Sequence, residues 1–327
     1  MSQLLIPVAS STKQAMRLLI TGCSGFLGRN VSEAGARDGH DILGIGRSGC
    51  PSGWPGEYLQ KNLTADYAAV IHDYRPDVIL HLAGPASVDA SFLDPLSDQQ
   101  ACVLTWSNTL ESVRRSGLNP LVLFPSSAAV YGNPHALPVS EHAAVVPISP
   151  YGFHKAACEL LALEYSECFG LNIVVCRFFS LFGVSQQRLL VWEVYKQLVD
   201  RDSTIWLEGT GTESRDYLHV DDATSAIFEL IENQLRVYKT RVTGQRLIVN
   251  IGSGQETNVL ELAEHLRNLV APEKRIRCRG NKQRGAPEHW VANIGRLRSL
   301  VPQWKSKALS VALSECVDAW QNSYHVV

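Results

Sequence analysis

The sequence of 327 residues predicts an α/β protein built around a doubly wound parallel sheet. Three observations support this prediction. Short apolar runs recur along the first half of the chain, segments of helical length separate them, and a glycine-rich turn follows the first run. A strand buried on both faces reads as a continuous apolar run, and parallel neighbours need a long connection, usually a helix. The alternation therefore favours a parallel sheet covered by helices on both sides.

The first half of the chain is expected to provide most of the sheet. We expect strands at residues 17–21, 41–45, 78–82, 121–124 and 173–176, a helix after the glycine-rich turn to about Asp38, and longer helices at 98–116 and 151–168. Beyond residue 185 the rhythm is less regular, with helices expected at 190–200, 221–233 and 259–269 and strands at 204–207 and 247–251. This change indicates a smaller C-terminal α/β portion, partly interleaved with the sheet.

Composition and charge narrow the class of protein. Hydrophobic residues make up 45% of the chain, which is ordinary for a globular protein, and the net charge of -2 offers no basic face for nucleic acid. Since no apolar run approaches about 18 residues, we expect no membrane-spanning helix. Neither the eight cysteines nor the ten histidines have the spacing of a metal site, and scattered thiols are typical of a reducing, cytoplasmic location.

The glycine-rich turn has the spacing of a phosphate-binding loop. In TGCSGFLG, three glycines stand between the first strand and the first helix. Glycine permits the tight turn, lets the backbone approach a pyrophosphate and allows the helix to pack closely on the strand. The unpaired N–H groups of the helix N-terminus then attract phosphate. The cofactor contacts expected from this turn are Gly22, Gly25, Phe26, Leu27 and Gly28.

The end of the second strand indicates which dinucleotide is bound. NAD enzymes place an acidic residue near the ribose 2′-hydroxyl, whereas NADP enzymes place an arginine near the 2′-phosphate. Here Arg47 follows the strand and no acidic residue is present. A solvated surface arginine would look the same, but we interpret Arg47 as a ligand of the 2′-phosphate, so NADP is favoured over NAD.

The chain is expected to have three parts. They are a tail without the features of a signal peptide (1–16), a Rossmann-type dinucleotide-binding domain (17–185) and a substrate-binding portion (186–327).

A tyrosine and a lysine lie one helical turn apart in SPYGFHK. Tyr151 and Lys155 should share a helix face, since residues four apart are neighbours on a helix. A neighbouring cation favours the phenolate and lowers the pKa of a phenol, which suits proton exchange with an alcohol while hydride moves. Upstream, Ser127 ends a predicted strand, where its hydroxyl would face the same crevice. The three residues predict an acid–base site for alcohol–ketone interconversion.

Taken together, these motifs resemble the extended short-chain dehydrogenases/reductases of the nucleotide-sugar epimerase/dehydratase type. The matching segments cover roughly residues 17–300 and follow the family's order: TGCSGFLG, HLAGPAS, SSAAVYG, SPYGFHK, RFFSLFG and ESRDYLHVDDA. The resemblance implies that Ser127, Tyr151 and Lys155 form the catalytic triad, with Tyr151 as acid/base and Lys155 on the nicotinamide ribose. It implies cofactor contacts at Asn62, Leu63, Leu82, Ala83 and Gly84. It implies substrate contacts at Ser87, Ser127, Ser180, Arg215 and Arg284.

Several positions depart from the family pattern. Ser180 and Ala101 stand where asparagine is common, which leaves the nucleotide and the sugar open. Dehydrating members usually carry an acidic pair directly after the active-site serine or threonine, and here the pair is Ala128 and Ala129. Because Glu141 is too distant in sequence to replace them, the pattern argues against a 4,6-dehydratase.

These observations predict an oxidoreductase that acts on a nucleoside-diphosphate sugar through a 4-keto sugar. Two guanidinium groups, Arg215 and Arg284, are suited to clamp the diphosphate. A C4 epimerase is slightly favoured, an NADPH-dependent 4-ketoreductase is the alternative, and a dinucleotide-binding regulator without catalysis is more remote because the triad is intact. The resemblance also implies a homodimer formed through the helices expected at 98–116 and 151–168.

Overall fold

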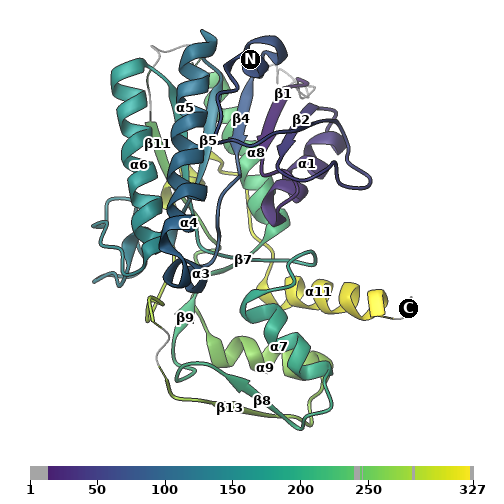
Figure 1. Ribbon diagram of the computed structural model, residues 1–327. Coiled ribbons are helices and arrows are strands. Elements are labelled where there is room, and N and C mark those ends of the chain that lie inside the picture. The colour runs from purple at the N-terminus through teal and green to yellow at the C-terminus, as the bar shows by residue number, and fades with distance from the viewer. Residues whose placement is uncertain (1–13, 239–243, 245, 282–283, 325–327) are drawn as a thin grey trace, which may run out of the picture.

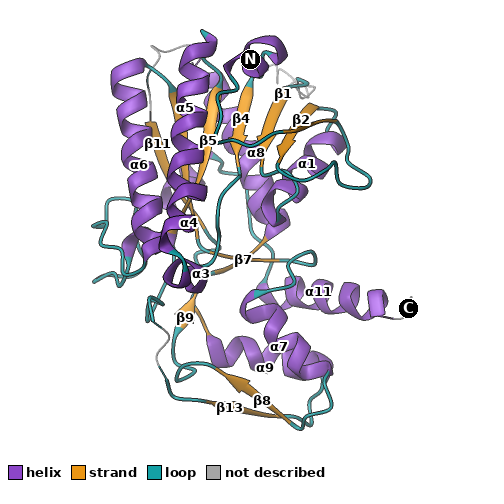
Figure 2. Cartoon of the chain, viewed as in Figure 1, coloured by secondary structure: helices purple, strands orange, loops and turns teal. Residues whose placement is uncertain are grey.

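The computed structural model of the protein describes residues 14–238, 244, 246–281 and 284–324 (Figure 1). All but the last three residues of the predicted tail, 1–16, lie outside this range. A central sheet with helices on both faces forms the upper part of the molecule, and a smaller lobe of helices and short strands lies below it (Figures 1 and 2). Among the helices described, none combines the length and apolar character that crossing a membrane requires.

The central sheet has seven strands in the described part of the chain, and all their pairings are parallel. In spatial order they are β11 (Arg246–Ile251), β6 (Asn172–Phe178), β5 (Leu121–Ser127), β4 (Val78–His81), β1 (Arg17–Thr21), β2 (Asp41–Gly46) and β3 (Glu57–Gln60). The chain winds outward from β1 in one direction and then resumes on the other side at β4. The prediction of a doubly wound parallel sheet is confirmed, and its switch point, where such folds bind ligands, lies between β1 and β4.

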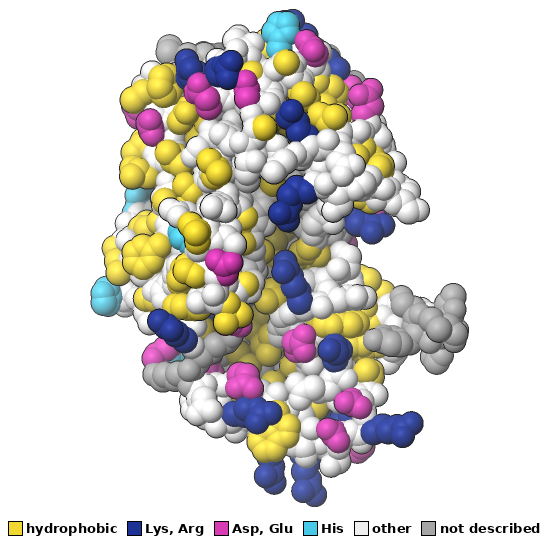
Figure 3. All heavy atoms as spheres, viewed as in Figure 1, with side chains coloured by type: hydrophobic (Ala, Val, Ile, Leu, Met, Phe, Trp, Pro, Cys, Tyr) yellow, Lys and Arg dark blue, Asp and Glu magenta, His cyan; other side chains and the backbone are white. Residues whose placement is uncertain are grey.

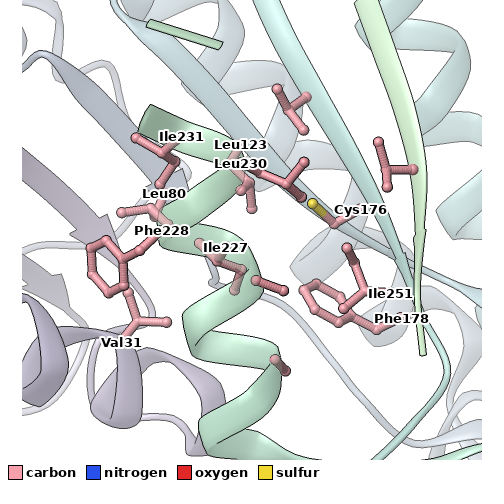
Figure 4. Packing of buried hydrophobic residues seen from close by; sticks show 14 of the residues in the cluster. Val31, Leu80, Leu123, Cys176, Phe178, Ile227, Phe228, Leu230, Ile231 and Ile251 are labelled. Carbon is pink, nitrogen blue, oxygen red and sulfur yellow. The ribbon is translucent and has the colours of Figure 1, made fainter. Parts of the chain in front are cut away.

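Each face of the sheet is covered by its own hydrophobic core. One face packs against α1 (Phe26–Arg37) and α8 (Val220–Tyr238). Figure 4 shows Phe228 of α8 lying between Val31 of α1 and the sheet. The other face packs against α2 (Ala68–Tyr74), α5 (Thr105–Ser116) and α6 (Pro150–Phe169). These two layers fix the carboxyl ends of the strands relative to the helices that start beside them.

The helix expected at 98–116 is interrupted. The structure places α3 (Val88–Leu93) and α4 (Pro95–Gln99) before a π-helical turn at Gln100–Leu104, and α5 follows directly. Thr105 Oγ1 donates a hydrogen bond to the Ala101 carbonyl, 2.7 Å away, at this widened turn. The helix expected at 151–168 is α6, which begins one residue earlier because Ser149 caps it and Pro150 occupies its first turn.

The lower lobe has a hydrophobic core of its own. Its helices and strands are α7 (Leu189–Val199), α9 (Val259–Val270), α11 (Leu309–Tyr324), the pair β8 (Thr204–Leu207) and β13 (Arg275–Cys278), and the pair β9 (Ser214–Arg215) and β12 (Thr257–Asn258). Between the lobe and the sheet lie β7 (Ser180–Phe182) and β10 (Tyr217–His219), and α10 (Gly295–Leu300) packs near β11. Residues after 185 contribute to both parts, since α8 and β11 belong to the sheet layer.

Candidate active site

A cavity of about 1140 Å³ lies between the carboxyl ends of the central strands and the lower lobe. Figure 3 shows the hollow between the two parts of the molecule. Its wall contains most of the residues singled out in the sequence: Gly25, Phe26, Leu27, Gly28, Leu82, Ala83, Gly84, Ser87, Ser127, Tyr151, Lys155, Ser180 and Arg215. This volume exceeds that of an ordinary small-molecule pocket, which suits two ligands or one long ligand.

The N-terminus of α1 forms one end of this cavity and fits a pyrophosphate. Gly25 is the residue before the helix, and no side chain caps it, so the first backbone N–H groups are left for a ligand. Gly22 has φ +64°, and a Cβ there would lie 2.5 Å from the Ala83 nitrogen. A Cβ on Gly28 would lie 2.3 Å from the Gly22 carbonyl oxygen. The turn therefore requires glycine at both positions, and its residues fit a dinucleotide.

The residues expected near the adenosine lie outside the cavity wall. Arg47 is exposed, and its carbonyl accepts a hydrogen bond from Gln60 Nε2. Asn62 is also exposed, and its Oδ1 accepts from the Thr64 N–H, 3.1 Å away. Leu63 is buried in the core under α2 and α5. The structure thus gathers the pyrophosphate end of the expected cofactor site and does not bring these three side chains to it.

A buried histidine lies beneath the loop that follows β4. His81 Nδ1 is 2.9 Å from Thr109 Oγ1 and 3.2 Å from Thr21 Oγ1, and Thr21 Oγ1 accepts from the Ala83 N–H. Thr109 already donates its hydroxyl hydrogen to the Thr105 carbonyl, so its oxygen accepts and Nδ1 carries the proton. Burial, and then the charge of Lys155, lower the pKa of His81 to about 3. A neutral histidine therefore contacts Thr21, and Thr21 in turn holds the loop at Leu82–Gly84 through the Ala83 N–H.

Tyr151, Lys155 and Ser127 all line the cavity. Lys155 Nζ lies 5.7 Å from the centre of the Tyr151 ring and donates to the Pro125 carbonyl, 2.8 Å away. Ser127 ends β5, and its Oγ accepts from the Ala129 N–H. Burial disfavours the charge of Lys155, but anionic forms of the neighbouring Cys102 and Tyr151 favour it, and the pKa of Lys155 lies above its ordinary value. The ammonium group is therefore charged at neutral pH.

Of the residues expected to contact the substrate, all but Arg284 line the cavity. Ser87 and Ser180 line the cavity, although Ser87 Oγ also caps α3 by accepting from the Ala90 N–H. Arg215 lines it from β9 and is half-buried, with its guanidinium 5.6 Å from the centre of the Trp290 ring. Burial lowers the pKa of Arg215. Arg284 is exposed, stacks 4.4 Å from the Phe92 ring and is not part of the wall.

Other side chains in the wall were not singled out in the sequence. Arg188 precedes α7, and Arg279 follows β13, where it pairs with Glu208 at 2.9 Å. Trp290 also lines the wall, although it lies far from Arg215 in the sequence. None of them belongs to a short motif, so a sequence pattern offers no indication of them. Only the packing of the lower lobe against the sheet brings them to the cavity.

In the described part of the chain, the two positions directly after Ser127, where a dehydratase usually carries an acidic pair, hold alanines. Ala128 and Ala129 are both buried. The side chain of Glu141 accepts from the Asn250 N–H, and Glu141 is not among the residues that line the cavity. In the ranges that the structure describes, no group of three His, Cys, Asp or Glu side chains is arranged to hold a metal ion.

Comparison with known proteins identifies the family. The model of the NAD dependent epimerase/dehydratase family matches residues 18–252. The chain belongs to this family. It is 29% identical over 273 residues to UDP-glucose 4-epimerase of Mycolicibacterium smegmatis, covering 79% of this chain and 84% of that protein. It is 28% identical over 316 residues to UDP-glucose 4-epimerase of Azospirillum brasilense, covering 89% and 88%.

A solved structure shows the same fold. The structure titled "MoeE5 in complex with UDP-glucose and NAD" superposes with a TM-score of 0.81 at 23% identity, over 94% of this chain and 99% of that one. Together with the family match, it confirms the predicted resemblance to the extended short-chain dehydrogenases/reductases and the prediction of an enzyme of that type. The relatives named as 4-epimerases support the epimerase over the ketoreductase and the regulator.

The predicted preference for NADP is wrong. The family is NAD dependent, and the superposed MoeE5 structure was solved with NAD. The prediction depended on Arg47, whose side chain is exposed and outside the cavity wall. A surface arginine is stable in water without a phosphate, so an arginine after β2 does not by itself indicate NADP.

Proposed function

We propose that this protein is an NAD-dependent 4-epimerase of a nucleoside-diphosphate sugar. One observation carries the proposal: a single cavity holds the uncapped N-terminus of α1, the Ser127–Tyr151–Lys155 group and the half-buried Arg215. The first two features suit a dinucleotide and an alcohol that is oxidised beside it. The third suits a diphosphate, and two curated relatives are named as UDP-glucose 4-epimerases.

The chemistry divides between the cofactor and the side chains. When bound at the glycine turn, NAD would supply the hydride acceptor and donor. Tyr151 takes the proton from the hydroxyl at C4 of the sugar as that carbon is oxidised, and the charge of Lys155 stabilises the phenolate. After the keto sugar has turned its other face to the cofactor, Tyr151 returns the proton to the same oxygen. Proton and hydride are both restored, so the reaction consumes no reductant.

Ser127 is placed to assist at the same oxygen. Its Oγ already accepts a hydrogen bond from the Ala129 N–H, 3.1 Å away, so its own hydroxyl hydrogen remains to be donated. Donation to the C4 oxygen would stabilise the negative charge that develops there during hydride transfer. In the same proposal, Arg215 holds the diphosphate, and the glycine turn with Gly22, Gly25 and Gly28 holds the pyrophosphate of the dinucleotide.

The proposal includes a homodimer in the cytoplasm. Large hydrophobic side chains stand exposed on neighbouring helices: Leu93 is 88% exposed, Leu160 66% and Phe153 58%. Figure 3 shows hydrophobic side chains on the side of the molecule where α6 lies. Single exposed apolar residues are ordinary, but a group of them on adjacent helices favours a protein interface. The eight cysteines are free thiols, which supports a reducing compartment.

The test begins with the purified protein and no added cofactor. The bound dinucleotide is released and identified, and the protein is then given UDP-glucose, with other nucleotide sugars as a panel. We expect bound NAD and the slow appearance of the C4 epimer. Tyr151→Phe should keep the bound NAD and lose turnover. Stoichiometric consumption of added NADPH without epimer would instead identify a ketoreductase, and full turnover by the Tyr151→Phe variant would exclude the proposed mechanism.

A further inference from the structure

Three buried polar residues lie on one face of α6. Tyr151, Lys155 and Glu159 follow each other at intervals of four residues, so their side chains line up toward the sheet. They are 9%, 4% and 5% exposed. The proposed mechanism uses the first two. It gives no role to Glu159, a carboxylate buried one turn beyond the ammonium group that stabilises the phenolate.

Glu159 is held by Arg177, which lies on β6 and is 3% exposed. Arg177 Nε donates to Glu159 Oε1 at 2.9 Å, and Nη2 donates to Oε2 at 2.6 Å. Both oxygens of the carboxylate are therefore occupied by one guanidinium fork. Ser126, the residue before Ser127, also donates its hydroxyl to Oε1. The pair thus ties the catalytic face of α6 to the end of β5.

Arg177 extends the connection to the segment that follows Ser127. Its Nη1 donates to the Tyr131 hydroxyl at 2.9 Å and to the Glu141 carbonyl at 3.2 Å. Tyr131 closes the short 3-10 helix that begins directly after Ser127, and its hydroxyl donates to Asn250 Oδ1. Residues on both sides of Ser127 are therefore bonded, directly or through Glu159, to the same guanidinium group.

The spacing of charges gives this arrangement a consequence for Lys155. A lysine and a glutamate four residues apart on a helix attract each other, most strongly where water is excluded. Lys155 instead donates to the Pro125 carbonyl and lies over the rings of Tyr151 and Phe124. The opposite charge that Glu159 contacts is the guanidinium of Arg177. Without the guanidinium, the buried carboxylate would keep only the Ser126 hydroxyl and would compete for the nearest ammonium group.

We propose that Arg177 is a positioning residue of the active site. By binding both oxygens of Glu159, it keeps that carboxylate away from Lys155 and fixes α6 against the strand end that carries Ser127. The inference rests on the proposed function for the roles of Tyr151, Lys155 and Ser127. It concerns residues of this chain, however, and part of its test needs no substrate.

The test compares two variants that differ only in whether the carboxylate remains. Arg177→Met leaves Glu159 with the Ser126 hydroxyl but without the guanidinium that balances its charge. We expect kcat to fall about 100-fold, the effect of a small displacement of a catalytic group. The double variant Glu159→Met/Arg177→Met removes both charges and keeps similar side-chain volumes. Proteins often tolerate such a replacement of a buried ion pair by apolar residues. We expect it to recover kcat to within about tenfold of the wild type, with KM changed little in both variants.

A third variant and a spectroscopic measurement keep the outcome decisive. Arg177→Lys retains the charge but not the fork, and if Arg177→Met does not fold, an unchanged kcat in this variant would overturn the proposal. The ultraviolet absorbance of the phenolate, measured as the difference between each protein and its Tyr151→Phe counterpart, is titrated with pH. We expect the midpoint to move to higher pH in Arg177→Met and to return in the double variant.

Two further results would overturn the proposal. One is an Arg177→Met protein with the phenolate midpoint and kcat of the wild type. The other is a double variant that melts like the wild type but is as slow as Arg177→Met, since the ion pair itself would then be required. If the wild type does not epimerise any nucleotide sugar, the proposed function fails, whereas the phenolate titration still tests the role of Arg177.

Discussion

Acid should destabilise this protein through His81, the buried histidine beneath the loop after β4. In the folded protein its pKa is about 3, whereas its ordinary value is 6.5. Between these values the unfolded chain binds a proton that the folded protein does not bind. The contribution of His81 to stability is therefore fully present above pH 6.5 and is lost as the pH falls toward 3. This is the direction expected for a base whose pKa is lowered by folding.

The size of the effect follows from the two pKa values. Between pH 7 and pH 5 the imidazole of the unfolded chain becomes almost fully protonated, and each pH unit below its pKa is worth about 1.4 kcal/mol. The free energy of unfolding should therefore fall by about 2 kcal/mol through this residue alone. The exact pKa of the folded state matters little, because any value well below 5 gives the same loss over this range.

The measurement is urea unfolding at pH 7 and pH 5, followed by tryptophan fluorescence. His81→Asn keeps a hydrogen-bonding group near Nδ1 but does not titrate, so it should lose about 2 kcal/mol less than the wild type between the two pH values. His72 is exposed and bonds Asp73 at the surface, so His72→Asn is the matched control and should follow the wild type. If His81→Asn and the wild type lose the same free energy, His81 is not held neutral by burial and the reasoning is refuted.

Three further predictions concern the cavity and the helix face. Gly22→Ala should remove bound NAD and destabilise the protein by about 1–3 kcal/mol, measured by dinucleotide content and melting, because its φ and the nearby Ala83 nitrogen exclude a Cβ. Arg215→Met should raise KM for the nucleotide sugar at least about tenfold, whereas Arg284→Met should change it less than about threefold; equal effects would contradict the placement of Arg284 outside the wall. Leu160→Glu should disrupt the proposed homodimer and give monomers in sedimentation with an unchanged fold, and an undisturbed dimer would exclude this face as the interface.

The parts of the site that the sequence predicted are those set by local spacing. Tyr151 and Lys155 share a face because four residues make about one helical turn, whatever the rest of the chain does. The glycine turn is similar, since Gly22 and Gly28 are required by contacts within the strand–turn–helix unit and its neighbouring loop. Most of these residues do line one cavity. Parallel strands that all end at one edge explain why.

The parts that the sequence did not predict depend on contacts between distant segments. The interruption of the helix expected at 98–116 by a π-helical turn has no counterpart in the apolar pattern. Arg188 and Trp290 reach the cavity only because the lower lobe folds back beneath the sheet. Arg284 was chosen from a motif match in a loop, and the loop turns its side chain onto Phe92 instead.

The error over the cofactor has a physical cause of the same kind. The preference for NADP was inferred from the identity of one side chain, Arg47, at a strand end. An exposed arginine there can be hydrated by water as readily as it can bind a phosphate. Glu159 and Arg177 show the opposite case, since each is almost fully buried and a buried charge must have a partner. The register of β5 and β6 places Ser126 opposite Arg177, so the pair lies at the strand end that carries Ser127. Burial, and not residue identity, is therefore what distinguishes a charged side chain that the site depends on from one that merely stands near it.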